Sequence, residues 1–297
     1  MAFVAILISN PAVPVITAAL LAKLAGALPQ AGAARWLASG IAADIPFART
    51  DRPSKALIDD LRGIIGDLPI DVAIVPEAYR RKKLLLADMD STMIQQECID
   101  ELAAFVGLKE QVSTITARAM RGEIAFEPAL RERVALLKGL PVSVVDDIID
   151  KHITLMPGGR ELVQTMKANG AYTALVSGGF TVFTARIAPM IGFDEDRSNI
   201  LELDGDTLAG LVREPILGKE AKQERLIALR SLKSLRPEET LAVGDGANDL
   251  AMLGEAGLGV ALHAKPAVAA AADVHIDHGD LTALLYLQGY QQKEFIC

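Results

Sequence analysis

The stretch Leu84-Leu85-Leu86-Ala87-Asp88-Met89-Asp90-Ser91-Thr92 decides the fold that we expect for this chain. Its apolar half is typical of a strand that is covered on both faces in a parallel sheet, and open α/β sheets present catalytic groups at the carboxyl ends of such strands. Asp88 and Asp90 are therefore placed to project into one crevice. Acidic residues also end strands and cap helices, so the pair taken alone leaves both interpretations open.

Helical and strand-like segments alternate after residue 152, which is typical of a parallel, doubly wound sheet. The expected strands span residues 171–176, 240–243, 258–261 and 274–276. The expected helices span residues 158–169, 219–233 and 249–256, with another after Phe180. A hairpin is predicted around Asp204-Gly205-Asp206. Between about 93 and 152 the pattern is helical throughout, and we expect an inserted helical cap there.

The first 80 residues predict a small α+β domain of their own. Strand-like and helical segments follow one another in the order β-α-β-β-α-β, with one bent strand or two short ones over residues 34–48 and a helix over 14–28. The basic cluster Arg80-Arg81-Lys82-Lys83 comes next, and its simplest interpretation is a linker. We therefore expect two domains, residues 1–80 and 81–297, as the chain length also favours.

Composition disfavours several classes of protein. Apolar residues make up 51% and charged residues 23%, which predicts a globular chain, while a net charge of −8 disfavours a nucleic-acid partner. Cys98 and Cys297 form no metal or redox motif, and so low a cysteine count favours a reducing, cytoplasmic compartment. Pro11 and Pro14 interrupt the apolar segment 3–28, so we expect neither a signal peptide nor a membrane span.

Three further features complete the pattern that a shared crevice requires. They are Ser177-Gly178-Gly179 after one expected strand, Lys222 in a later helix, and Gly244-Asp245-Gly246-Ala247-Asn248-Asp249 after another strand. Singly, they are also interpreted as a turn, a solvated helix charge and a loop. Their joint order and spacing favour a common site.

With Asp88-x-Asp90-x-Thr92, these features resemble the four signature motifs of the haloacid-dehalogenase-like (HAD) phosphohydrolases, over residues 84 to 280. Within that superfamily the chain is similar to the phosphoserine phosphatases, through segments listed here in chain order: Glu97, Ala119-Met120-Arg121-Gly122, Phe126 and Arg133. The resemblance implies a HAD-like α/β core with a helical cap. The N-terminal domain resembles the ACT-like, amino-acid-binding module that precedes this core in many bacterial members.

The resemblance also implies a role for each motif residue. Asp88 is expected to be a covalent nucleophile, and Asp90 a general acid and then a general base. Asp88, the backbone carbonyl of Asp90 and Asp245 are expected to hold Mg²⁺, which prefers oxygen ligands. Asp249 is expected to support the site rather than to bind the metal directly.

A second set of residues is implied to bind the substrate. The phosphoryl group is expected to contact Ser177, Gly178, Lys222 and Asn248. Glu97 is expected to pair with the ammonium of serine and Arg133 with its carboxylate, although both are also interpreted as surface helix charges. Met120 and Phe126 resemble the apolar wall of the cap.

We therefore expect a Mg²⁺-dependent enzyme that hydrolyses O-phospho-L-serine in the last step of L-serine biosynthesis, with no nucleic-acid or membrane partner and with a homodimer left open. Alternatives are a related phosphatase or phosphotransferase with another small substrate, and a non-enzymatic amino-acid sensor. Glu97 and Arg133 argue against a sugar phosphate. The group His275-Ile276-Asp277-His278-Gly279-Asp280 contains metal-ligand residue types, but its loop-like context disfavours a second metal site.

Overall fold

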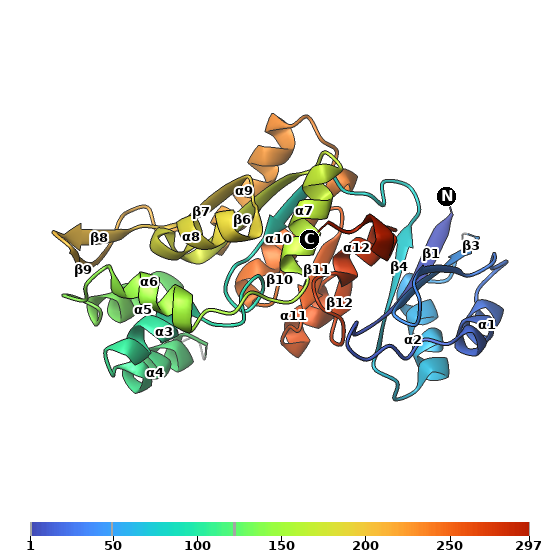
Figure 1. The fold of residues 1–297 in the computed structure, drawn as a ribbon, viewed down its shortest axis with the longest axis horizontal. Helices are drawn as coiled ribbons and strands as arrows, with labels where there is room; N and C mark the ends of the chain where they lie inside the picture. Colours follow the sequence, from blue (N-terminus) through green and yellow to red (C-terminus); the bar gives the residue numbers. More distant parts are fainter. Residues whose placement is uncertain (1, 49, 121–122, 297) are drawn as a thin grey trace.

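The computed structural model describes residues 2–48, 50–120 and 123–296, with only the backbone of Met120. An N-terminal domain lies at one end of an elongated molecule, an α/β core in the middle and a helical cap at the other end (Figure 1). The predicted fold class is confirmed: a doubly wound parallel sheet carries an inserted helical cap and follows a small α+β domain of the ACT-like kind. We propose that the chain divides near residue 80, between the two sheets.

The N-terminal domain is an antiparallel sheet in the order β2-β3-β1-β4 with two helices on one face. Its elements are β1 (Phe3–Ser9), α1 (Ala18–Ala27), β2 (Arg35–Ala38), β3 (Ala42–Phe47), α2 (Ser54–Ile65) and β4 (Ile70–Pro76). The expected element order is found, and the segment 34–48 forms two strands. Helix α1 begins at Ala18 rather than near residue 14, because the Thr17 side chain caps it by accepting a hydrogen bond from the Leu20 N–H at 3.2 Å.

Strand β1 is apolar almost throughout because both of its faces are covered. Ala5 and Leu7 lie in the apolar cluster under α1 and α2. Val4, Ile6 and Ile8 belong to the cluster that contains helix α12 (Ala283–Leu287) of the core. The N-terminal sheet is therefore sandwiched between its own helices and the core (Figure 1).

The core is a six-stranded sheet in the order β12-β11-β10-β5-β6-β7, in which all neighbours pair in parallel. The strands are β5 (Leu84–Ala87), β6 (Tyr172–Phe180), β7 (Glu195–Asn199), β10 (Thr240–Gly244), β11 (Gly259–Leu262) and β12 (Val274–Ile276). The helices besides α12 are α7 (Gly159–Ala168), α8 (Thr181–Ile191), α9 (Lys219–Leu232), α10 (Leu250–Glu255) and α11 (Pro266–Ala271). Short 3₁₀ turns span Pro237–Glu239, Ala247–Asp249 and Gln292–Glu294.

Strand β5 shows why its sequence is an unbroken apolar run. Leu84 and Leu86 face the cluster that includes Leu226 of α9. Leu85 and Ala87 face the opposite cluster, which α7, α8 and α12 help to form. All four strand residues are fully buried, as expected for a strand with helices on both sides.

The cap is inserted between β5 and β6. It consists of α3 (Cys98–Phe105), α4 (Lys109–Met120), α5 (Phe126–Ala135) and α6 (Val144–Lys151). The predicted hairpin is confirmed as β8 (Leu201–Asp204) and β9 (Thr207–Val212), and it packs against α5 beside the cap (Figure 1).

Two buried carboxylates join the N-terminal domain to the core. Asp44 lies 2.6 Å from Arg80 Nη1, and Arg80 Nε donates to the Leu287 carbonyl at 2.7 Å. Asp71 accepts hydrogen bonds from backbone N–H groups of the loop 277–279 at 2.7–3.2 Å. Arg80, the first residue of the basic cluster between β4 and β5, therefore helps to hold the two domains together, because its guanidinium is bound on both sides.

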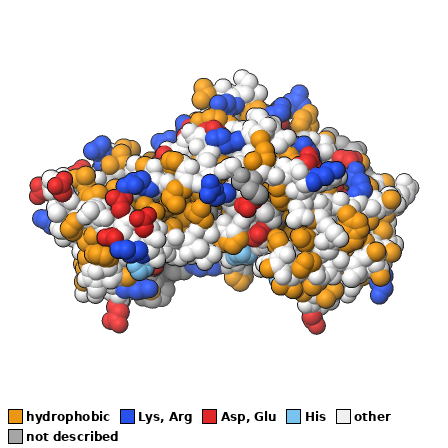
Figure 2. Space-filling model, viewed as in Figure 1, with side chains coloured by type: hydrophobic (Ala, Val, Ile, Leu, Met, Phe, Trp, Pro, Cys, Tyr) orange, Lys and Arg blue, Asp and Glu red, His pale blue; other side chains and the backbone are white. Residues whose placement is uncertain are grey.

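In the described part of the chain, no helix combines the length and the apolar character that crossing a bilayer requires. On the face shown in Figure 2, Lys and Arg side chains are interspersed with Asp and Glu rather than gathered into one basic surface. This distribution is in line with the net charge of −8.

Candidate active site

Three neighbouring strands of the core present polar residues at one edge of the sheet. Asp88 follows β5, Ser177 lies in the last part of β6, and Asp245 follows β10. A cavity of about 470 Å³ lies at this edge, between the core and cap helices α4 and α5. Among the predicted site residues, those that line it are Asp88, Asp90, Glu97, Arg133, Gly178, Asp245 and Asn248.

Ser177 and Lys222 lie behind the lining residues and contact them directly. Lys222 extends from α9, is 2% exposed, and places Nζ 2.6 Å from Asp88 Oδ1 and 2.6 Å from Asp249 Oδ1. The Ser177 hydroxyl donates to Asp90 Oδ2 at 3.2 Å. The structure thus brings together side chains from four distant segments of the chain.

Asp88 has one occupied and one open carboxylate oxygen. Oδ1 accepts a hydrogen bond from the Met89 N–H at 2.8 Å and pairs with Lys222. Among the described residues, Oδ2 has no such contact, while every fully buried side-chain nitrogen or oxygen has a partner. Oδ2 is therefore the oxygen that Asp88 presents to the cavity.

The buried charges at this edge are mostly negative. Oxygens of Asp88, Asp245 and Asp249 lie within 4.8 Å of one another. Burial raises the pKa of Asp88 and of Asp245, and the charge of Asp249 raises both further. Burial lowers the pKa of Lys222, but the charges of Asp88 and Asp249 outweigh it and hold this pKa above its ordinary value. One ammonium among three carboxylates leaves an excess of negative charge that a divalent cation with oxygen ligands fits.

Asp249 has both oxygens engaged by the protein. Oδ1 faces Lys222, and Oδ2 accepts a hydrogen bond from the Gly246 N–H at 3.0 Å. Position 244 needs a glycine, because a Cβ there would lie 2.4 Å from Asp249 Cγ. These contacts leave Asp88 and Asp245 as the side chains suited to holding a cation.

Asp90 is held by contacts from two elements. Its Oδ1 accepts a hydrogen bond from the Cys98 N–H at 2.9 Å, where helix α3 begins. Burial raises the pKa of Asp90, against the effect of the hydrogen bonds from Cys98 and Ser177. A Cβ on Gly179 would lie 2.9 Å from Asp90 Oδ2, so the glycine lets the β6 turn approach this carboxyl closely.

Glu97 supplies a carboxylate on the cap side of the cavity. Its Oε1 accepts a hydrogen bond from the Ser91 hydroxyl at 2.6 Å. Burial, with a further contribution from the charge of Asp90, raises the pKa of Glu97 to about 7. A cationic group that bound in the cavity would favour the ionised form of Glu97 and pair with it.

Arg133 supplies the opposite charge on helix α5. Its Nη1 donates to the Thr116 hydroxyl at 3.3 Å and its Nε to the Ala129 carbonyl at 3.2 Å, and no described residue accepts a bond from Nη2. Burial lowers the pKa of Arg133 although the charges of Asp100 and Glu97 raise it. The guanidinium thus keeps donor capacity for a ligand in the cavity.

The cap also reaches the turn that contains Gly178. Phe126 lines the cavity, and a Cβ on Gly178 would lie 3.8 Å from its Cζ. Of the residues that carry the family resemblance, Arg121, Gly122 and the side chain of Met120 lie outside the described residues. Cys297, which we expect to form no metal or redox motif, also lies outside them.

The sequence analysis does not single out the polar lining residues Asp100, Thr116 and Lys265. Lys265 follows β11 at the same sheet edge, so the strand-end rule that singles out Asp88 also covers it. Thr116 lies on α4 in a polar helical stretch, and only its contact with Arg133 distinguishes it.

Comparison with known proteins agrees with this arrangement. A family model described as a haloacid dehalogenase-like hydrolase matches residues 82–257. The chain belongs to this family. The phosphoserine phosphatase of Polaromonas sp. is 47% identical over 210 residues, which are 69% of this chain and 89% of the relative. The probable phosphoserine phosphatase of Schizosaccharomyces pombe is 45% identical over 216 residues, 72% of each chain. The resemblance that the motifs indicate is confirmed.

Solved structures of this hydrolase family have the same fold. A HAD family hydrolase from Salmonella enterica serovar Typhi superposes with a TM-score of 0.86 at 29% identity and covers 96% of this chain and 98% of its own. A phosphoserine phosphatase described as a phospho-aspartyl intermediate analogue superposes with a TM-score of 0.64 at 41% identity, over 69% of this chain and 98% of its own. The first comparison includes the N-terminal domain as well as the hydrolase core.

Proposed function

We propose that this hydrolase is a phosphoserine phosphatase, which converts O-phospho-L-serine to L-serine and phosphate in the last step of L-serine biosynthesis. The observation that carries the proposal is the content of one cavity. Asp88 and Asp90 form a carboxylate pair in its wall, which the buried ammonium of Lys222 contacts from behind through Asp88. Glu97 and Arg133 add opposite charges for an amino acid. Relatives at 45% and 47% identity bear this enzyme's name.

The first step forms a covalent intermediate on Asp88. Its open Oδ2 attacks phosphorus, the bond between phosphorus and the serine oxygen breaks, and the departing oxygen takes the proton of Asp90. The raised pKa of Asp90 favours the protonated form that this step requires. Lys222 pairs with the other oxygen of Asp88, Oδ1. This ion pair holds the carboxylate in place and leaves the attacking oxygen, Oδ2, unpaired among the described residues.

The second step returns the enzyme to its starting state. Asp90, now ionised, removes a proton from a water molecule that attacks phosphorus, and the bond to Asp88 breaks to release phosphate. Ser177, next to Asp90, and the backbone amide of Gly178 are proposed to donate to phosphoryl oxygens, with Asn248 at the cavity wall.

Asp88, Asp245 and the backbone carbonyl of Asp90 are proposed to hold Mg²⁺. The excess of negative charge among the buried carboxylates supports a divalent cation at this place. When bound, Mg²⁺ offsets the charge repulsion between the phosphate and the carboxylates. Asp249 is proposed to position Lys222, since both of its oxygens are already engaged.

Phosphate release is the measurement that tests this proposal. We expect turnover of O-phospho-L-serine to exceed that of glucose 6-phosphate by at least about 100-fold, because an unpaired Glu97 and Arg133 penalise a sugar. Removal of divalent ions with EDTA should abolish turnover, and Mg²⁺ should restore it. A preference for the sugar phosphate, or transfer of phosphate to an added alcohol in place of water, would refute the assignment.

Replacing Arg133 with alanine should selectively impair the amino-acid substrate. We expect kcat/KM for O-phospho-L-serine to fall by about 10- to 100-fold, the effect of losing a hydrogen-bonded charge partner, while 4-nitrophenyl phosphate is turned over as before. The matched control is Arg131→Ala on the same helix, because Arg131 pairs with exposed Glu127 and Glu214. Equal losses on both substrates in the Arg133 variant would contradict its role in selectivity.

A further inference from the structure

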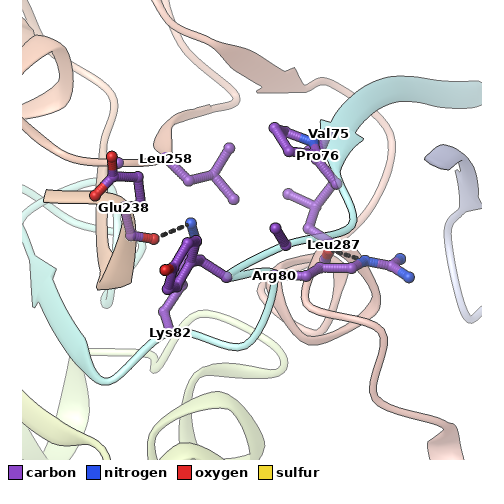
Figure 3. Close-up of a pocket in the computed structure, with 10 residues that line it drawn as sticks. Val75, Pro76, Arg80, Lys82, Glu238, Leu258 and Leu287 are labelled. Atoms are coloured by element: carbon purple, nitrogen blue, oxygen red, sulfur yellow. Dashed lines mark hydrogen bonds between the residues drawn. The ribbon is translucent and has the colours of Figure 1, made fainter. Parts of the chain in front are cut away.

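A second cavity, of about 220 Å³, lies where the N-terminal domain meets the core (Figure 3). Val75 and Pro76 come from the end of β4, Leu258 from the residue before β11, and Leu287 from the end of α12. Lys82 lies just before β5, so this cavity borders the amino ends of the core strands. The candidate active site lies at their carboxyl ends, and the two cavities have no lining residue in common.

Lys82 brings a positive charge into this largely apolar space. The residue is 8% exposed, and its Nζ donates to the Glu238 carbonyl at 2.7 Å (Figure 3). No carboxylate of the described residues lies within 4.0 Å of Nζ. Burial lowers the pKa of Lys82 to about 8, and the charges of Asp273 and Glu238 act against this shift.

The other cation at the cavity is already satisfied. Arg80 pairs with Asp44 through two nitrogens and donates to the carbonyls of Leu287 and Tyr286. Lys82 has three N–H donors and one carbonyl partner, which leaves two donors without a protein acceptor among the described residues. Asp273 and Glu238 offset part of the cost of burying this ammonium, but neither carboxylate pairs with it directly, so an anion that accepts from the two remaining donors would lower the cost further.

We propose that this cavity binds a small branched aliphatic monocarboxylate, whose carboxylate pairs with Lys82 and whose alkyl chain packs against Val75, Leu258 and Leu287. The volume sets the size of the ligand. It is below the roughly 300–1,000 Å³ of pockets for drug-sized molecules, and above the about 150 Å³ of a cavity that holds benzene. An acid of five or six carbons, such as 4-methylpentanoate, matches this volume.

Such a ligand touches both domains at once. Val75 and Pro76 belong to the N-terminal sheet, whereas Glu238 and Leu258 belong to the core. Because the ligand binds only where these segments meet, its binding also favours the docked arrangement of the two domains.

Isothermal titration calorimetry of the full chain with 4-methylpentanoate tests this site. The titrations are run with Mg²⁺ and inorganic phosphate in excess, so that the candidate active site is occupied. We expect saturable binding of the acid, and binding at least about tenfold weaker for its neutral isostere 4-methylpentanamide. This comparison needs no variant and therefore does not depend on the folding of one.

Variants then locate the binding. Lys82→Met should weaken binding of the acid by at least about tenfold, and Ala78→Phe, which adds a bulky ring to the lining of the cavity, should abolish binding of both probes. Lys83→Met is the matched control, because Lys83 is exposed and pairs with Glu239, and it should bind as the parent does. All three should keep full phosphatase activity. The proposal is overturned if the parent protein binds no acid, if acid and amide bind alike, or if Lys82→Met binds the acid as tightly as Lys83→Met.

Discussion

Asp88→Asn is expected to abolish phosphate release from O-phospho-L-serine, with a loss in kcat of at least about 10⁴-fold. The asparagine amide keeps the shape of the side chain, and its oxygen still accepts hydrogen bonds from Met89 and Lys222, but its nitrogen is no nucleophile. Steady-state phosphate release measures the effect.

The variant should remain folded. In the parent protein the charge of Asp249 repels that of Asp88 and raises its pKa. The substitution removes one of three clustered carboxylates and therefore lowers this repulsion. The matched control is Asp60→Asn in the N-terminal domain, where the carboxylate is exposed and pairs with Arg52. If Asp88→Asn hydrolysed the substrate as fast as Asp60→Asn, a covalent mechanism on this residue would be excluded.

Lys222→Met is expected to reduce both activity and stability. The ammonium is 2.6 Å from Asp88 and 2.6 Å from Asp249, and the substitution leaves these buried carboxylates without their counter-charge. Breaking a buried ion pair in this way costs about 3–5 kcal/mol of unfolding free energy. The activity should fall by at least about 100-fold, because the substitution also removes the ammonium that holds Asp88 and that we expect to contact the phosphoryl group.

The stability loss in Lys222→Met should depend on pH. Without the ammonium, burial and repulsion from the charge of Asp249 raise the pKa of Asp88 in the folded state further above that of the unfolded chain. The folded state then binds more protons, so its stability falls as the pH rises. Urea unfolding in the absence of divalent ions measures the unfolding free energy. The loss of unfolding free energy in Lys222→Met relative to the parent protein should be larger at about pH 8 than at about pH 5.

The matched control for this variant lies on the same helix. Lys219 of α9 is exposed and pairs only with its exposed neighbour Glu220 among the described residues. Lys219→Met should therefore unfold as the parent does at both pH values. If Lys222→Met unfolded like Lys219→Met, Lys222 would not be the counter-charge of this site.

The central strand of the fold and the main residues of the candidate site can be predicted from the sequence, because short local patterns identify them. An apolar run marks β5 as doubly covered, and polar residues directly after it mark the sheet edge. The same rule places Asp245 after β10. The order of the strands, with β10 and β6 on either side of β5, requires the structure.

Strand β7 shows where this approach fails. Its sequence, Glu-Asp-Arg-Ser-Asn over residues 195–199, has no apolar pattern, so nothing in it predicts a strand. It lies at the edge of the sheet, and polar contacts from other elements hold its side chains. Thr184 donates to Asp196, and Arg225 pairs with Glu195 at 2.6 Å. Such contacts join residues far apart in the chain, which hydrophobic periodicity does not record.

The basic cluster after the N-terminal domain connects β4 to β5, as a linker does, but two of its four side chains are buried rather than solvated. A run of four cations is normally solvated, and composition alone assigns it to the surface. Arg80 is instead buried against Asp44, 36 residues earlier, and Lys82 is buried beside Glu238, 156 residues later. Partners so far apart in the chain are brought together by the tertiary fold, which local composition does not record.

A rapid-quench experiment tests the proposed mechanism most directly. The enzyme is mixed with O-phospho-L-serine that carries a radiolabelled phosphoryl group, quenched with acid within one turnover, and digested for peptide mapping. We expect label on the peptide that contains Asp88, and no label in Asp88→Asn. Release of labelled phosphate with no protein-bound label at any time, or label on a different residue, would contradict this mechanism.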